Sequence, residues 1–250
     1  MPKHNLGLVS VSFRENSPEE ILDAMKRTKL TCIEWGSDIH APCKDTEKLY
    51  ELVRLQDKYD IFCCSYGTYF RLGTDDAKEL THYANAAKIL GTNLLRIWCG
   101  NKGAHLFSKE EKKHFFEESK KAAHIAQDLG VILCMECHNN TYTETLEGTL
   151  ELMNEVCSPC FRMYWQPNQF KDFKTNAEYA RSISSYVENV HVFNWEGNNK
   201  YPLCEAVGVW KEYISCFDKP KNLLLEFMPD GKIESLEKEA DALSVIAAYN

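Results

Sequence analysis

The chain has 250 residues, of which 44% are hydrophobic, and its formal net charge is −8. This acidic balance argues against general binding to nucleic acid, and no apolar run approaches the roughly 18 residues of a membrane span. No Pro/Gly/Ser-rich linker divides the chain, so we expect a single domain over residues 1–250. The N-terminal residues lack a signal-peptide core and the eleven cysteines fall mostly in strand-like runs, so we expect a cytoplasmic protein with reduced thiols.

Strand-like and helix-like segments alternate along the chain. Helix starts are marked by Ser17 before Pro18 and by the Ser108 to Glu111 capping box, and helix ends by Gly91 and Gly130. In chain order, the predicted strands are 6–13, 31–35, 61–66, 93–99, 131–138, 161–167, 189–193 and 222–227, and the helices that follow them span 17–29, 45–59, 74–90, 108–129, 144–156, 175–186, 206–217 and 233–249.

Eight strand-then-helix units with short connections predict parallel strands joined by right-handed crossovers. At this chain length, that pattern favours a closed (β/α)8 TIM barrel. An open doubly wound sheet is the alternative, but it usually has a glycine-rich phosphate loop after the first strand, whereas residues 10–15 contain no glycine.

The last four predicted strands end in polar side chains, and active sites of such barrels lie at these C-terminal ends. The strands deliver Glu136 followed by His138, then Gln166 followed by Asn168, then His191, and finally Glu226. Two carboxylates, an imidazole and an amide oxygen suit Mn²⁺, Mg²⁺, Co²⁺ or Zn²⁺. Since burying unpaired acids is costly, we predict a metal site formed by Glu136, Gln166, His191 and Glu226.

Other strand ends offer candidate contacts to a substrate. Aromatic rings can flank the apolar face of a sugar, and polar side chains can bind its hydroxyl groups. Trp165 precedes Gln166, so alternation along the strand should turn it outward. The predicted substrate-binding residues are His138, Asn168, Trp35, Tyr69, Arg96 and Trp98.

The chain resembles the xylose isomerase-like (β/α)8 superfamily, which includes sugar isomerases and epimerases as well as apurinic endonucleases. Glu136 with the following His138 is similar to that family's Glu-x-His strand end. His191 between two valines and Glu226 between Leu225 and a phenylalanine match its next ligands. In the family, Glu, Asp, His and Glu hold the metal, so Gln166 stands where Asp is usual.

This resemblance implies a divalent-metal-dependent isomerase or epimerase acting on a small sugar or a sugar-like polyol or ketoacid. No Arg/Lys cluster follows the last two predicted strands, which favours a substrate without phosphate. Glu136 and Glu226 would remove and return a proton next to a carbonyl group, through an enediolate. The acidic net charge and the lack of a long apolar run predict no nucleic-acid partner and no membrane partner, and the sequence leaves a homo-oligomer open.

Three alternatives stay open beside the isomerase. A related metal-dependent dehydratase would use nearly the same residues. A non-catalytic or metal-depleted carbohydrate-binding barrel is an alternative because Gln166 leaves a divalent ion in a formally neutral shell. An apurinic endonuclease is disfavoured, because Gln169 and Asn194 stand where ligands of a trinuclear zinc cluster are expected and the net charge is acidic.

Overall fold

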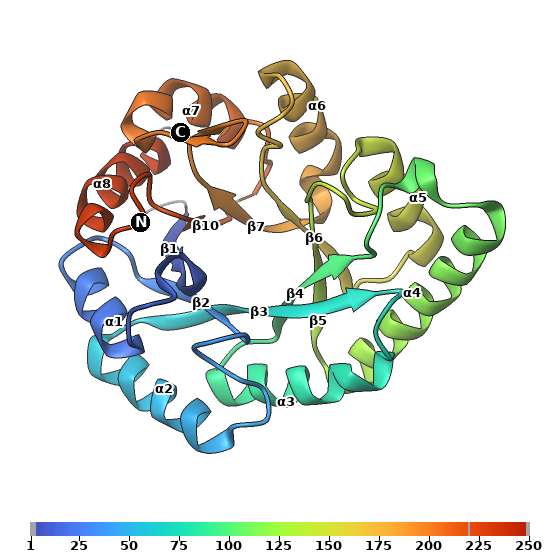
Figure 1. Ribbon diagram of the computed structural model, residues 1–250, viewed down its shortest axis with the longest axis horizontal. Coiled ribbons are helices and arrows are strands. Elements are labelled where there is room, and N and C mark those ends of the chain that lie inside the picture. Colours follow the sequence, from blue (N-terminus) through green and yellow to red (C-terminus); the bar gives the residue numbers. More distant parts are fainter. Residues whose placement is uncertain (1–3, 220, 249–250) are drawn as a thin grey trace.

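The computed structural model describes residues 4–219 and 221–248. Eight parallel strands close into a barrel in the order β1-β10-β7-β6-β5-β4-β3-β2, with helices around the outside (Figure 1). The predicted (β/α)8 barrel is thereby confirmed. The barrel strands are β1 (Asn5–Val9), β2 (Cys32–Gly36), β3 (Phe62–Leu72), β4 (Leu94–Cys99), β5 (Ile132–Glu136), β6 (Phe161–Trp165), β7 (Val187–Val192) and β10 (Asn222–Leu225).

The two helix starts and the two helix ends that capping signals marked in the sequence are confirmed. Ser17 and Ser108 both form capping boxes, and Gly91 and Gly130 end their helices with φ of 88° and 67°. The helices are α1 (Pro18–Lys26), α2 (Thr46–Tyr59), α3 (Leu80–Leu90), α4 (Lys109–Leu129), α5 (Leu146–Val156), α6 (Phe173–Ile183), α7 (Val207–Ile214) and α8 (Leu236–Ala247).

The main hydrophobic core lies between the barrel and the helices. Trp165 at the end of β6 is fully buried there and packs against Trp210, Tyr213 and Phe217. Its predicted outward direction is therefore confirmed. A second, smaller apolar cluster contains Cys134, which lies two residues before Glu136 and so shares its face of β5.

Most predicted boundaries differ from the structure by a few residues, and the two largest differences in the strands lie near the mouth of the barrel. The first strand ends at Val9, and Ser10–Phe13 turn into a 3-10 helix. This turn lets Ser10 accept a hydrogen bond from the Gly36 amide and Ser12 accept one from the Phe227 amide. The third strand continues to Leu72, because its last residues pair with β4.

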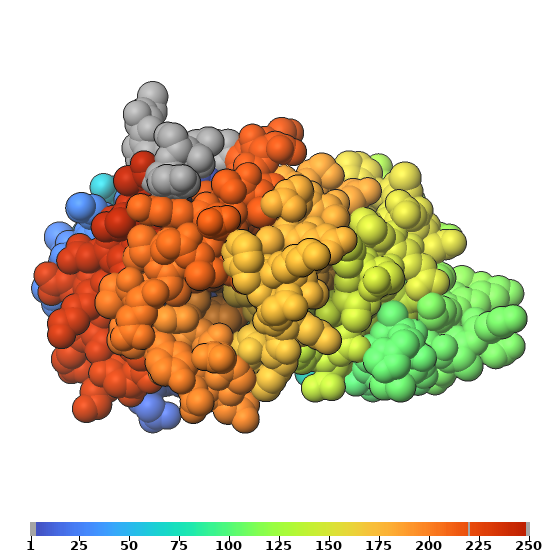
Figure 2. Space-filling view, turned by 90° about the horizontal axis from the view of Figure 1, so that it is seen from above, coloured from blue at the N-terminus to red at the C-terminus, as the bar shows by residue number. Residues whose placement is uncertain are grey.

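A view at right angles shows the strand–helix units packed into one body, with the green region that includes α4 at one end (Figure 2). A short antiparallel hairpin, β8 (Trp195–Glu196) and β9 (Asn199–Lys200), lies between β7 and α7. Among the described residues, no helix combines the length and the apolar character that a membrane crossing requires.

Candidate metal and active site

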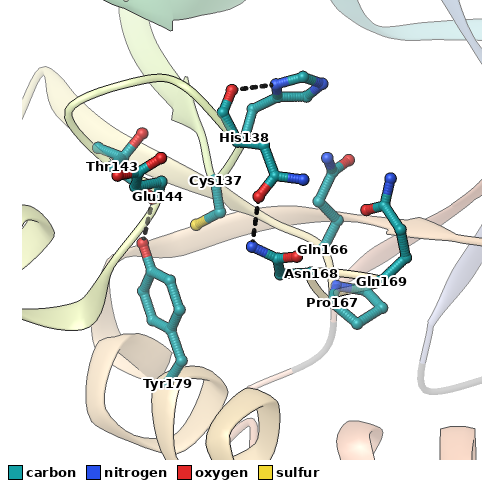
Figure 3. Close-up of a pocket in the computed structure, with 10 residues that line it drawn as sticks. Cys137, His138, Thr143, Glu144, Gln166, Pro167, Asn168, Gln169 and Tyr179 are labelled. Carbon is teal, nitrogen blue, oxygen red and sulfur yellow. Dashed lines mark hydrogen bonds between the residues drawn. The ribbon is translucent and has the colours of Figure 1, made fainter. Parts of the chain in front are cut away.

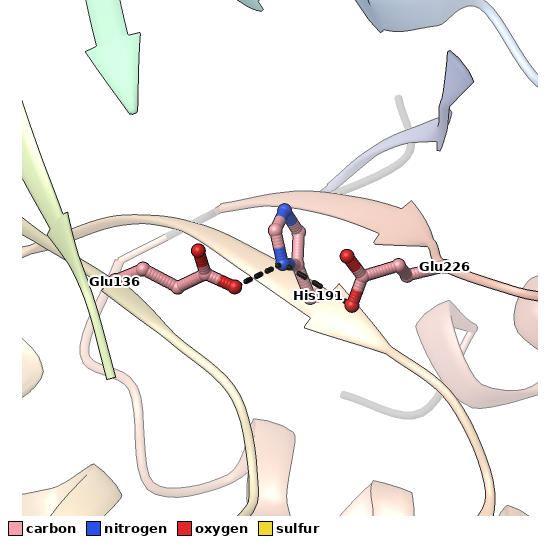
Figure 4. A group of neighbouring side chains, drawn as sticks. All are labelled: Glu136, His191 and Glu226. Carbon is pink, nitrogen blue, oxygen red and sulfur yellow. Dashed lines mark ion pairs between the residues drawn. The ribbon is translucent and has the colours of Figure 1, made fainter. Parts of the chain in front are cut away.

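The four side chains predicted to bind metal converge inside the barrel. The Nδ1 atom of His191 lies 3.0 Å from Gln166 Oε1, 3.7 Å from Glu136 Oε1 and 3.5 Å from Glu226 Oε2. Glu136 and Glu226 approach the imidazole from opposite sides (Figure 4). The order of parallel strands explains this convergence, since β5, β6, β7 and β10 are successive neighbours in the barrel wall.

The chemistry of these donors fits a divalent metal ion. Glu136, His191 and Glu226 each offer one ligand atom, these atoms lie within 4.8 Å of one another, and all three residues form a buried group. The amide oxygen of Gln166 is a fourth donor on the same side of the imidazole. Oxygen and imidazole ligands of this kind suit several divalent ions, so the geometry does not select one metal.

A buried arginine adjoins the ligand group and pairs with two carboxylates. Arg96 on β4 contacts Glu34 through Nε at 2.9 Å and Glu136 through Nη1 at 2.8 Å, and only 4% of its surface is exposed. These two ion pairs fix the position of the Glu136 carboxylate. Contact of Arg96 with a substrate stays a prediction.

Glu34 is a buried acid of the site that the sequence prediction left out. It has no exposed surface, and its Oε2 atom accepts hydrogen bonds from Ser65 at 2.9 Å and from Tyr164 at 2.5 Å. The same oxygen lies 3.8 Å from Nε2 of His191, the ring atom that faces away from the ligand group. The sequence did contain a signal for this residue, because Glu34 is an acid within the otherwise apolar stretch of residues 32–36.

The space for the ion pair of Glu34 and Arg96 depends on a glycine of β3. A Cβ atom built on Gly67 would lie 2.6 Å from Glu34 Oε1 and 2.9 Å from Arg96 Nη2. Both distances are too short for non-bonded atoms, so a side chain at this position would displace the pair.

The carboxyl groups of Glu136 and Glu226 differ in their electrostatic surroundings. Burial alone would raise the pKa of Glu136, but Arg96 and His191 lower it to about 2. Burial raises the pKa of Glu226, and this effect exceeds the opposing attraction of His191. Burial would lower the pKa of His191, but Glu226, Glu136 and Glu34 together raise it to about 10. Glu136 is thus held ionised while Glu226 accepts a proton more readily.

Metal binding should therefore release a proton from His191. This side chain is protonated below its pKa of about 10, and a metal ligand must be neutral, so higher pH favours the ion. We expect release of about one proton per Mn²⁺ near pH 7 and about tenfold tighter binding for each pH unit of increase. Calorimetry in buffers of different ionisation enthalpy measures this release. Binding heats that do not depend on the buffer would contradict this proton release. His191→Gln is the control, because its side chain has no proton to release.

Replacing Gln166 with aspartate should strengthen metal binding. An added charge 4 Å from the ion is worth about 4 kcal/mol before solvation costs at an effective dielectric of about 20. We expect Gln166→Asp to bind Mn²⁺ at least about tenfold more tightly in calorimetry, a change of about 1.4 kcal/mol. Asn168→Asp, which adds the same charge two residues farther on, should have a smaller effect. Equal affinities of wild type and Gln166→Asp would refute the expectation.

The rings of two predicted substrate contacts, Trp98 and His138, meet at an angle of 47° above the ion pairs. The ring centroids of Trp98 and His138 are 4.4 Å apart, and the guanidinium carbon of Arg71 lies 4.5 Å from the Trp98 ring centroid. Trp98 lies two residues beyond Arg96, and His138 two residues beyond Glu136. The rings are therefore about 7 Å farther along the strands, toward the mouth. Arg71 was missed because its segment was not predicted to be part of a strand.

Tyr69 lies at the rim of the same mouth and is 39% exposed. Its hydroxyl accepts a hydrogen bond from Arg14 at 2.6 Å and donates one to Asp38 at 3.2 Å. Arg14 and Asp38 also form an ion pair. Contact of Tyr69 with a substrate stays a prediction.

Asn168 lies in a small side pocket between the segments that follow β5 and β6 (Figure 3). Its amide group donates a hydrogen bond to Asn139 Oδ1 at 2.5 Å. Gln166 borders this pocket as well as the ligand group, so the pocket adjoins the candidate metal site. Substrate contact by Asn168 likewise stays a prediction.

The prediction that Trp35 contacts substrate was wrong. Trp35 is fully buried, and its indole nitrogen donates a hydrogen bond to Gln56 on α2 at 2.9 Å. The physical reason is strand alternation: because Glu34 faces the barrel interior, its neighbour Trp35 must face the helices.

Fold and site together define a (β/α)8 barrel with a candidate metal centre at the C-terminal ends of its strands. Residues 22–200 match the family described as xylose isomerase-like TIM barrel, and the chain belongs to this family. One curated relative is 3-dehydroshikimate dehydratase from Bacillus anthracis, which is 30% identical over 191 residues. The match covers 67% of this chain and 65% of that protein, so it spans slightly less than two thirds of the relative's length.

Solved structures share the fold at low sequence identity. The probable 3-DHS dehydratase AsbF involved in petrobactin synthesis from Bacillus anthracis is 18% identical, with a TM-score of 0.80 over 96% of this chain and 98% of that one. A xylose isomerase-like TIM barrel protein from Mycobacterium smegmatis, in complex with magnesium, is 8% identical with a TM-score of 0.75 over 98% and 97%. The 3-keto-D-glucoside 4-epimerase YcjR from E. coli is 10% identical with a TM-score of 0.73 over 98% and 100%.

Proposed function

We propose that the protein is a metal-dependent isomerase or epimerase of a small sugar, or of a sugar-like polyol or ketoacid. The observation that carries this proposal is the pair Glu136 and Glu226, which approach His191 from opposite sides at 3.7 and 3.5 Å. Acid–base groups on two sides of a bound molecule can remove a proton from a carbon atom on one side. They can return a proton to the same carbon from the opposite side, or to the neighbouring carbon. Enzymes with the same fold, named above, support an enzymatic role.

The two glutamates have different duties in this proposal. Glu226, whose pKa is raised by burial, is the better proton acceptor at neutral pH and would remove the proton next to the carbonyl group. Glu136, whose pKa is held at about 2, would stay ionised as a ligand until the reaction weakens its pairing with Arg96. It would then take up a proton from solvent water and pass it to the substrate carbon. A divalent ion held by Glu136, Gln166, His191 and Glu226 would supply stabilisation of negative charge on the substrate oxygens.

The test is hydrogen exchange at carbon. The protein is loaded with Mn²⁺ and incubated in D₂O with unphosphorylated ketoses and sugar-derived ketoacids of five and six carbons, and the products are followed by NMR. We expect deuterium to replace the proton next to the carbonyl in the recovered substrate and in its isomer or epimer. Products that contain no deuterium, or no exchange with any ketose or ketoacid, would reject the proposal.

A dehydratase is the second candidate, favoured by the 30% identical relative of that name. The first step is the same, since Glu226 would remove the proton next to the carbonyl; a hydroxyl group on the next carbon would then leave as water. Incubation with 3-dehydroshikimate separates the candidates, because elimination gives a conjugated product with a new ultraviolet absorption. In either case we propose a small-molecule substrate, no nucleic-acid partner and a cytoplasmic location.

A further inference from the structure

We propose that the substrate carries a carboxylate group, which Arg71 binds at the mouth of the barrel. This inference rests on the proposed function, because it places the reacting carbonyl group of the same molecule beside Glu136 and Glu226. It narrows the substrate to sugar-like acids, such as polyhydroxylated ketoacids.

The first support is the pairing of Arg71 itself. Its side chain is half-buried, and among residues 4–219 and 221–248 no carboxylate lies within ion-pairing distance of its guanidinium. Nη1 donates to the carbonyl oxygen of Gly100 at 3.2 Å, and the guanidinium carbon lies 4.5 Å from the Trp98 ring centroid. These contacts fix the group but leave most of its five N–H donors for another acceptor. A partly desolvated cation without a counter-ion is costly, so it favours an anionic ligand.

The second support is the distribution of charge along the barrel. The base of the site holds three carboxylates, Glu34, Glu136 and Glu226, beside the single guanidinium of Arg96. Arg71 lies farther along the strands, at the mouth, so an anionic group of the substrate would be repelled from the base and attracted to the mouth.

The geometry suits a small molecule that reaches from Glu136 at the base of the site to Arg71 at the mouth. The rings of Trp98 and His138, with the Arg71 guanidinium over Trp98, lie about 7 Å along the strands from Arg96 and Glu136. That separation corresponds to a few carbon–carbon bonds between a carbonyl group at the base and an acid group at the mouth. The planar guanidinium matches a carboxylate in two parallel hydrogen bonds. A phosphate would need further cations, whereas the nearby Lys102 is paired with Glu111 at 2.7 Å.

The experiment compares three ligands that share a six-carbon polyol chain: D-gluconate, neutral D-glucitol and D-glucitol 6-phosphate. Each is titrated calorimetrically into the full chain with Mg²⁺ present. The variant is Arg71→Met, which removes the charge and keeps the length of the side chain. Arg54→Met, the same change at an exposed position of α2, is the matched control. If Arg71→Met lowers the folded fraction, Arg71→Gln takes its place.

We expect wild type and Arg54→Met to bind D-gluconate at least about tenfold more tightly than D-glucitol, and Arg71→Met to lose this preference while binding D-glucitol unchanged. Equal binding of D-gluconate and D-glucitol, a preference that survives in Arg71→Met, or tightest binding of D-glucitol 6-phosphate would overturn the inference. Binding needs no turnover, so the outcome is independent of the proposed reaction. A preference for D-gluconate without deuterium exchange would reject the proposed function alone.

Discussion

Replacing Glu226 with glutamine is expected to lower kcat at least about a thousandfold while leaving the fold intact. The change removes the proton acceptor but keeps an amide oxygen that can still face the metal ion, and loss of a positioned acid–base group typically costs about 10² to 10⁴ in rate. Steady-state turnover and the rate of deuterium exchange measure the effect.

A matched control is Glu205→Gln, since Glu205 is exposed on the surface before α7 and should retain full activity. Glu136→Gln differs from Glu226→Gln in one respect, because it also leaves Arg96 without one of its two partners and should weaken metal binding. Retention of more than about a tenth of the activity by Glu226→Gln would rule out Glu226 as the main proton acceptor.

Replacing Arg96 with methionine is expected to lower the free energy of unfolding by about 3–5 kcal/mol, because it leaves two buried carboxylates unpaired. Arg96 and His191 keep the pKa of Glu136 near 2, and they lower that of Glu34 as well, in both cases against the effect of burial. This stabilisation is present above the ordinary pKa of glutamate and is lost as pH falls through the lowered values. The defect should therefore be largest at neutral pH and shrink in acid, as chemical denaturation at several pH values would reveal.

The control for Arg96→Met is Arg162→Met. Arg162 pairs with Glu188 at 2.9 Å, but the two side chains are 26% and 34% exposed, so the expected loss is below about 1 kcal/mol. Adding Glu34→Gln to Arg96→Met should restore part of the lost stability, because one unpaired charge is removed. An Arg96→Met protein as stable as wild type at neutral pH would show that the buried pairs contribute nothing net.

The barrel and the four predicted metal ligands followed from the sequence because both depend on local patterns. Alternating strands and helices determine the fold, and parallel strands bring their C-terminal ends together, so Glu136, Gln166, His191 and Glu226 were expected to meet. The periodicity of a strand also predicted the outward direction of Trp165. These inferences need no knowledge of which strand faces which across the barrel.

The contacts of Glu34 with Ser65 and Arg96 inside the barrel could not be derived from local sequence patterns. The pairing of β2 with β3 shifts register between Ile33 and Glu34, and this irregularity brings Ser65 opposite Glu34. A one-residue shift changes which side chains face inward, and no local pattern announces it. The error at Trp35 has a different cause, because alternation along β2 turns Trp35 outward once Glu34 faces inward. The length of β3 was missed because residues 67–68 resemble a turn, so Arg71 was assigned to a loop.

Gly67 makes three neighbouring strands of the barrel interdependent. Because Gly67 on β3 has no side chain, Glu34 of β2 and Arg96 of β4 can both extend into the space beside it. A Cβ atom at Gly67 would lie 2.6 Å from Glu34 and 2.9 Å from Arg96. A side chain at residue 67 would therefore require Glu34 or Arg96 to move or to be shortened. A substitution on one strand thus has its consequence on two others, although the three residues lie far apart in the sequence.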